Sequence, residues 1–363
     1  MTEQTDKRIF GLDLFRAIAI ICVVLTHGGF LIDKALPGFP WFSVPDGVEL
    51  FFVLSGFLIG GMLIRLLEEH KLETKKDLIY FWKRRWFRTL PAYYLVLLLN
   101  LLFAYIGWNN SKPEAFDWKF LVFSHNLFEP FTDFFWESWS LSVEEWFYLI
   151  LPIMIVSVQF GLRAYVSAKN LMFSIILTLL ILPLIYRMSL SNVTLDNFWY
   201  EVTFRKTVIC RMDAIIYGVL MAWMMNYYGA VVNKFRWILF LAGAAIMYYS
   251  KEYWLTNTTG YYAMTWYFSL MGLGASLLIP LANSWKKFDN SIGRAITHIS
   301  LISYSMYLIN LGLIGQVMAT HYKIENETDS ILGYLAFWTI LIIGSTCLYK
   351  YFEKPMTDLR DKL

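Results

Sequence analysis

Two ionisable residues, Arg16 and His27, interrupt the first long apolar stretch of the chain. They are eleven positions apart, so on an α-helix both side chains lie on one face, roughly 16 Å apart along the axis. Ionisable groups within a membrane span are costly and usually face a cavity. An imidazole titrates near neutral pH and can act as a general base or carry an acyl group. We therefore expect His27 to be catalytic. The structural alternative is a pair of interfacial side chains that snorkel toward opposite headgroups.

Carboxylates that open other apolar stretches are the candidates to assist His27. Glu144 and Glu145 lie near the start of one such stretch, and we expect this pair to be catalytic. Adjacent helical residues point about 100° apart, so at most one of the two shares the cavity of His27. We expect substrate contacts from four further polar residues, Glu49, Ser142, Arg211 and Asp213. The alternatives are a solvated rim of charges in which Arg211 pairs with an acid and, for Ser142, a helix cap.

A third cluster is the basic and aromatic run at residues 81–91. Arg85 and Arg88 are three positions apart and therefore lie on one helical face. Paired guanidinium groups suit phosphate recognition, whereas ordinary positive flanking of a membrane span is the alternative. With Arg16 predicted at the same depth, the sequence indicates two layers. Arginines form the layer at the inner face of the membrane, and a histidine with carboxylates forms the outer one.

Composition identifies the elements that must position these residues. Of 363 residues, 58% are hydrophobic and only 16% are charged, whereas a soluble domain is about a quarter charged. A bilayer span needs roughly 20 mostly apolar residues. Such segments lie near 12–31, 47–66, 87–106, 139–160, 171–187, 208–228, 235–250, 262–282, 297–318 and 331–350. We therefore predict an all-α, polytopic transmembrane bundle of about ten helices.

The distribution of basic residues predicts the topology. Most of the 31 Lys and Arg fall in loops and ends on the side of the N-terminus, which predicts that both termini are cytoplasmic. We expect one membrane domain over residues 1–363, without an appended soluble domain. The net charge of +3 makes nucleic acid a poor partner. Three cysteines, Cys22, Cys210 and Cys347, lack metal or redox spacing, so we expect packing roles and no metal site.

Seven motifs, taken in order along the chain, resemble those of the membrane acyltransferase-3 family. The spacing of Arg16 and His27 resembles the signature of the first helix, and residues 47–57 resemble the second-helix motif. Arg85 and Arg88, followed by Pro91, resemble the basic motif. The further matches are Trp139-Ser-Leu-x-x-Glu144-x-x-Phe-Tyr148, Arg211-Met-Asp213 with Gly218, Ser303-Tyr-Ser-Met-Tyr-Leu308 and Glu353-Lys-Pro355. The chain departs from the family pattern at Asn310, where members often carry His.

This resemblance implies O-acylation, usually acetylation, of a cell-surface or lipid-linked glycan, with cytoplasmic acetyl-CoA as the donor. It implies an integral protein of the bacterial inner membrane whose partners are acyl-CoA, a glycan or glycolipid acceptor and membrane lipids. The arginines Arg16, Arg85 and Arg88 would then bind the phosphates of CoA. His27 would perform the catalysis, and Glu144 would orient His27 or stabilise its cation.

Two other classes of function fit part of the pattern. Intramembrane charges in two layers also suit a transporter or flippase of an anionic lipid or glycan. The lack of an internal inverted repeat weighs against that alternative. A non-catalytic member of the family that senses or scaffolds is the third interpretation, and Asn310 favours it slightly.

Overall fold

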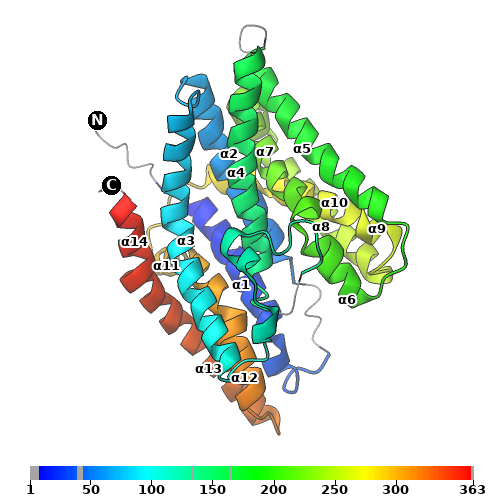
Figure 1. The fold of residues 1–363 in the computed structure, drawn as a ribbon, viewed down its shortest axis with the longest axis vertical. Coiled ribbons are helices and arrows are strands. Elements are labelled where there is room, and N and C mark those ends of the chain that lie inside the picture. Colours follow the sequence, from blue (N-terminus) through cyan, green and yellow to red (C-terminus); the bar gives the residue numbers. More distant parts are fainter. Residues whose placement is uncertain (1–7, 39–43, 132–133, 163–165, 361–363) are drawn as a thin grey trace.

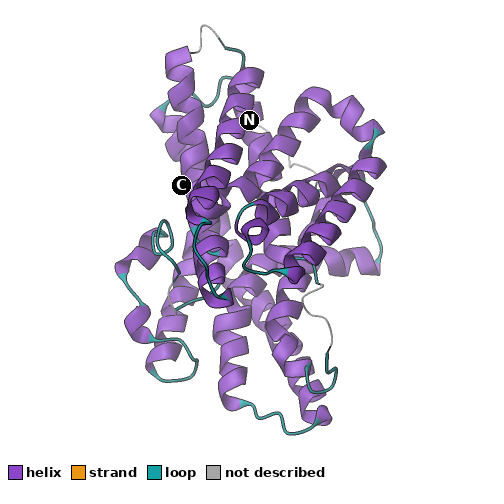
Figure 2. Cartoon of the chain, turned by 90° about the vertical axis from the view of Figure 1, so that its right-hand side faces the viewer, coloured by secondary structure: helices purple, strands orange, loops and turns teal. Residues whose placement is uncertain are grey.

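The structure, a computed structural model, describes residues 8–38, 44–131, 134–162 and 166–360. Over these ranges the protein is 81% helical and has no strand, and Figure 2 shows helices joined by loops. The predicted all-α fold is therefore confirmed. The cytoplasmic location of both termini and the extent of the single domain stay predictions.

Within the described ranges, nine helices are long and apolar enough to cross a membrane. Seven of them are single helices: α1 (Phe10–Ile32), α2 (Gly47–Glu68), α3 (Lys75–Tyr105), α4 (Ser138–Leu162), α5 (Ala168–Leu190), α7 (Val208–Lys234) and α10 (Trp266–Ser284). Two are composite and contain a π-helical turn. They are α11 (Ser291–Ile309) with η5 (Asn310–Gly315) and α12 (Gln316–His321), and α13 (Glu327–Leu348) with η6 (Tyr349–Glu353) and α14 (Lys354–Leu359).

The predicted segment 235–250 forms a tenth long helix, α8 (Arg236–Thr256), which is not among the nine apolar ones. It carries Arg236, Lys251 and Glu252, and Lys251 belongs to the candidate site described below. The shorter elements are η2 (Pro113–Ala115), η3 (Trp118–Val122), α6 (Asn197–Tyr200), η4 (Glu201–Arg205) and α9 (Tyr261–Met264).

Capping residues begin two of the helices that carry the site. Asp46 is the N-cap of α2, and its side chain accepts a hydrogen bond from the backbone N–H of Val48 at 3.0 Å. At the start of α3, Thr74 and Asp77 form a reciprocal capping box. Side chains of this type satisfy the free N–H groups of the first turn, so the local sequence determines where these helices start.

The first helix lies inside the bundle, next to α2, α10, α11 and α13 (Figure 1). Its contact with α2 depends on Gly47, because a Cβ there would lie 2.2 Å from the carbonyl oxygen of Ala19. Similarly, a Cβ on Gly218 of α7 would lie 2.0 Å from the carbonyl oxygen of Val53 on α2. Small residues thus let the helix backbones approach closely, and the start of α2 comes to lie beside α1.

Candidate active site

Two cavities lie along α1 and the beginning of α2. We name the first the arginine cavity, because Arg16, Arg85 and Arg88 line it. We name the second the histidine cavity, because His27 lines it. Val48 contributes to the lining of both. The two cavities therefore adjoin at the first turn of α2.

The arginine cavity has a volume of about 110 Å³ and gathers the three arginines that the sequence predicts at one depth. Arg16 donates to Ser300 Oγ at 3.4 Å and lies 3.6 Å from a carboxylate oxygen of Asp13. The Nε of Arg85 is buried and has no hydrogen-bond partner among the described residues. A buried guanidinium N–H without a partner favours an anionic ligand. This geometry suits the binding of a phosphate group.

The adjacent acids of α4 point in different directions, as their spacing predicts. Glu144 lines the arginine cavity and accepts hydrogen bonds from Ser55 Oγ at 2.7 Å and from the Tyr148 hydroxyl at 3.2 Å. Glu145 accepts a hydrogen bond from Thr89 Oγ1 at 2.7 Å and lines neither cavity.

The position of Glu144 corrects one expectation. The family resemblance implies that Glu144 orients His27, but the structure places Glu144 with the arginines. The residue lies almost two turns into α4, roughly 9 Å from its first residue, and so reaches the depth of Arg16. The helical period determines which way a side chain points, but it does not determine which neighbour it meets.

The hydrogen-bond partner of His27 lies far away in the sequence. Its Nδ1 lies 2.5 Å from Oδ1 of Asn310, which begins the π-helical turn η5. Its other ring nitrogen, Nε2, has no hydrogen-bond partner in the part of the chain that the structure describes. The ring lines the histidine cavity, so His27 is accessible to a ligand there.

The histidine cavity is the larger of the two, with a volume of about 310 Å³. Asp46 and Arg205 form an ion pair at 2.6 Å in its lining, and Lys251 Nζ donates to the carbonyl oxygen of Val44 at 2.5 Å. Burial alone would raise the pKa of Asp46, but attraction by Arg205 and Lys251 outweighs it and holds this pKa below its usual value. The cavity therefore contains a fixed negative charge and two cations near His27.

Aromatic rings complete the lining of the histidine cavity. Trp254 of α8 and Tyr267 of α10 stack with their ring centroids 5.3 Å apart, and both residues line the cavity. A volume of this size with aromatic and polar groups suits a small polar molecule with apolar faces, such as a sugar.

The four predicted substrate-binding residues lie outside both cavities. Arg211 of α7 forms a buried salt bridge with Glu49 of α2, and Asp213 pairs with Arg187 of α5 at 2.7 Å. Ser142 donates to the backbone carbonyl oxygen of Ser138 in its own helix at 3.2 Å. Arg211 thus pairs with an acid, as the alternative predicts, but the charges are buried and do not form a solvated rim. The two ion pairs tie α2 and α5 to α7, and Ser142 does not cap its helix.

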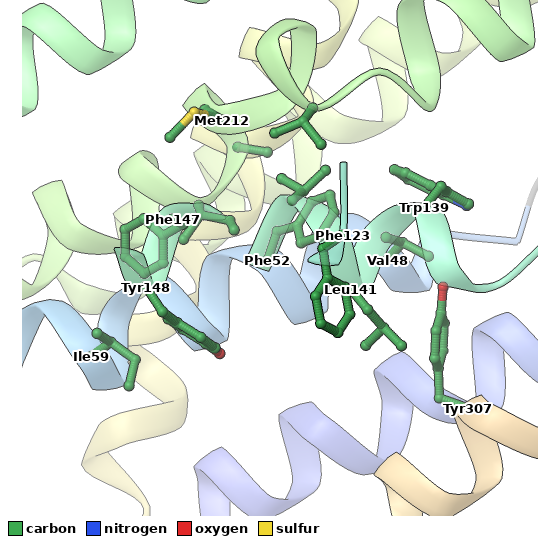
Figure 3. Close-up of a cluster of buried hydrophobic side chains, with 14 of the residues drawn as sticks. Val48, Phe52, Ile59, Phe123, Trp139, Leu141, Phe147, Tyr148, Met212 and Tyr307 are labelled. Carbon is green, nitrogen blue, oxygen red and sulfur yellow. The ribbon is translucent and has the colours of Figure 1, made fainter. Parts of the chain in front are cut away.

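The lining of the arginine cavity includes Tyr307 of α11. Its hydroxyl shares a 2.6 Å hydrogen bond with Ser140 Oγ and donates to the carbonyl oxygen of Glu137 at 3.1 Å. Figure 3 shows this hydroxyl directed toward the helix that carries Leu141. Both Ser140 and Tyr307 line the arginine cavity. This hydrogen-bonded contact therefore joins α4 to α11 at that cavity.

Several contributors to the site are not predicted by the sequence: Asn310, Asp46, Arg205, Lys251, Trp254 and Tyr267. Asn310 was singled out only as a departure from the family pattern. For Asp46 a signal exists, because an acid directly before Gly47 is a helix-capping signal. The contact of Arg205 with Asp46 has no sequence signal, because 159 positions separate the two residues.

Comparisons with known proteins agree with the geometry. The acyltransferase domain family, acyltransferase-3, matches residues 9–350. O-acetyltransferase OatA of Staphylococcus aureus (strain NCTC 8325) is 32% identical over 168 residues, which are 40% of this chain and 24% of that protein. Peptidoglycan O-acetyltransferase OatA of Listeria monocytogenes (strain EGD-e) is 30% identical over 168 residues, 43% of this chain and 25% of that protein.

A third relative, from S. aureus strain COL, is 23% identical over 381 residues, 96% of this chain and 57% of its own length. The chain thus spans between about a quarter and rather more than half of the length of these relatives. No solved structure matches the chain.

Proposed function

Since this chain belongs to the acyltransferase-3 family, we propose that it is a membrane O-acyltransferase. We propose that it moves an acyl group, most simply acetyl, from acyl-CoA to a hydroxyl of a cell-surface or lipid-linked glycan. Two relatives named as O-acetyltransferases, one of them acting on peptidoglycan, support the reaction and the class of acceptor. A bacterial inner membrane location is part of the same proposal.

The observation that carries the proposal is that Val48 lines two cavities, one with the arginines and the other with His27. A donor of this kind has phosphate groups at one end and a thioester at the other. Arg16, Arg85 and Arg88 would bind the phosphates. The thioester would then extend along α1 toward His27, while the acceptor occupies the histidine cavity.

The proposed chemistry is a direct transfer between the two substrates. The ring nitrogen of His27 that is not bonded to Asn310 removes the proton from the acceptor hydroxyl. The hydroxyl oxygen forms the ester bond to the acyl carbon, and the carbon–sulfur bond of the thioester breaks. The departing thiolate then receives the proton from His27, so the histidine ends neutral.

The role of His27 is tested in cells that produce the His27→Ala variant at the level of the parent. We expect the acetyl-ester content of the surface glycan to fall by at least about a hundredfold, because general-base catalysis contributes on that order. His298→Ala is the matched control, because His298 is exposed on α11 and lies outside both cavities. Unchanged acetylation in the His27→Ala cells would contradict the assignment.

The donor is tested by the affinity of the purified protein for CoA. We expect the double substitution of Arg85 and Arg88 by Ala to weaken binding by at least about tenfold, because two charge-assisted contacts to phosphate are lost. Arg84→Ala is the matched control, since Arg84 donates to the hydroxyl of Tyr80 and lines neither cavity. A parent protein without measurable CoA affinity would instead support a transporter of unrelated cargo.

A further inference from the structure

We propose that Asn310 and Glu137 form one positioning device for His27. Asn310 determines which ring nitrogen of His27 carries the hydrogen, and Glu137 holds the π-helical turn that presents Asn310. The inference about the ring hydrogen stands on geometry alone, whereas its consequence for turnover rests on the proposed function.

The orientation of the Asn310 amide follows from its neighbours. Its Nδ2 donates to the backbone carbonyl oxygens of Met306 at 3.0 Å and Tyr307 at 2.7 Å. The oxygen Oδ1 is therefore the atom that lies 2.5 Å from Nδ1 of His27. The reversed amide would place its oxygen against two carbonyl oxygens and would lose both hydrogen bonds.

This orientation determines the tautomer of His27. An amide oxygen can only accept a hydrogen bond, so the hydrogen must be on Nδ1 of His27. The lone pair then belongs to Nε2, which has no hydrogen-bond partner among the described residues. Because Asn310 is neutral, it selects the tautomer without a charge that would favour the imidazolium.

Glu137 binds the backbone of the π-helical turn η5, which begins at Asn310. Its Oε1 accepts the backbone N–H groups of Leu311 at 3.1 Å and Gly312 at 2.6 Å, the two residues that follow Asn310. The turn also packs against α3, because a Cβ on Gly312 would lie 2.2 Å from Oδ1 of Asn100. Single π-helical turns occur frequently at functional sites. Here the turn leaves Asn310 bonded to two carbonyl oxygens and aimed at His27.

The device needs one acceptor oxygen of Glu137 and not its charge. The second carboxylate oxygen, Oε2, is buried without a hydrogen-bond partner in the described part of the chain. Glu137 directly precedes α4, and burial raises its pKa to about 7, although the N–H groups of Gly312 and Leu311 act in the opposite direction. A neutral amide at this position can therefore accept the same two hydrogen bonds.

The tautomer is tested directly by nitrogen-15 NMR on protein that is labelled at histidine and held in lipid nanodiscs at neutral pH. The His27→Gln variant identifies the signals of His27 among the five histidines. We expect a hydrogen-bearing Nδ1 and a hydrogen-free Nε2 in the parent, and a mixture of both tautomers in Asn310→Leu. Hydrogen on Nε2 in the parent, or an unchanged tautomer in Asn310→Leu, would overturn the proposal.

Turnover kinetics test the consequence for the reaction. We expect Asn310→Leu to lower kcat by at least about tenfold while the KM for acyl-CoA stays unchanged, since a wrong tautomer removes the base and not the donor site. Asn310→His should restore part of kcat, because an imidazole nitrogen can also accept the hydrogen bond. Asn226→Leu is the control, as Asn226 is exposed and donates to Glu68. A full kcat in Asn310→Leu would contradict the positioning role.

Two substitutions of Glu137 distinguish the role of its acceptor oxygen from the role of its negative charge. We expect Glu137→Ala to lower kcat like Asn310→Leu, and Glu137→Gln to recover most of it. Equal losses in both variants would overturn the role assigned to Glu137. If His27→Ala leaves acyl transfer intact, the catalytic role proposed for His27 fails, while the NMR signals of the parent still decide whether Asn310 sets the tautomer.

Discussion

At the scale of single residues, some charges within the helices line a cavity, whereas others are buried in an ion pair. Arg16 and Arg85 line the arginine cavity. Arg211 and Glu49, in contrast, form an ion pair with each other, and their side chains are 0% and 2% exposed. A buried ion pair is rarely a large net gain, but removing one partner leaves an uncompensated charge.

We therefore expect Arg211→Leu to destabilise the fold by about 3–5 kcal/mol, because Glu49 is left buried without its partner. The double variant that combines Arg211→Leu with Glu49→Gln should recover most of this loss. The midpoint of thermal unfolding in detergent measures both effects. A double variant no more stable than the single one would show that the ion pair is not the cause.

At the scale of elements, the segment between α3 and α4 positions the residues at the start of α4. His125 stacks on Phe120 with ring centroids 4.0 Å apart, and its Nε2 lies 3.0 Å from the hydroxyl oxygen of Ser138, the first residue of α4. Glu137 lies directly before that serine. The packing of this segment thus supports the residue that holds η5.

The buried His125 predicts a pH dependence of stability. Burial lowers the pKa of His125 to about 3 from its ordinary value of 6.5. Between these two pH values the unfolded chain therefore binds a proton on this side chain, whereas the folded protein does not. The stability that this residue contributes is present above about pH 6.5 and is lost as the pH falls toward 3. The loss is at most about 1.4 kcal/mol per pH unit.

Thermal unfolding at pH 7, 6 and 5 measures this effect. We expect the midpoint of His125→Phe to fall less with decreasing pH than that of the parent, because a phenyl ring keeps the stacking on Phe120 and does not titrate. Parallel pH dependences of the two proteins would assign the acid sensitivity to other groups.

At the scale of the whole molecule, the proposed reaction depends on the boundary between the two cavities. Val48 lines both and is 8% exposed. In the proposed reaction the donor extends from one cavity to the other beside Val48, and a large ring there would obstruct it without removing any of the three arginines. Donor binding and acyl transfer should therefore respond differently to a substitution there.

We expect Val48→Trp to lower acyl transfer by at least about tenfold while CoA affinity stays within about twofold of the parent, since overpacking here affects the passage and not the phosphate contacts. Retained CoA affinity also shows that the variant is folded. Val48→Ala, which widens the same point, should lose much less transfer. Equal transfer by the Trp and Ala variants would exclude a passage at Val48.

The sequence by itself determined the properties that depend on one helix at a time. Apolar segments of bilayer length determined the all-α fold, and nine of the described helices are long and apolar enough to cross a membrane. The helical period placed Arg16 and His27 on one face and separated Glu144 from Glu145. These predictions needed only the geometry of a single helix.

Only the tertiary structure decided which helices bring their residues together. Glu144 lies with the arginines, and Arg211 forms an ion pair with Glu49. Asn310 lies beside His27, although 283 positions of sequence separate the two residues. Such contacts depend on the depth and rotation at which helices pack, and close backbone approaches such as those at Gly47 and Gly312 set both. A helical period determines the direction of a side chain, whereas its partner depends on helices that lie far away in the sequence.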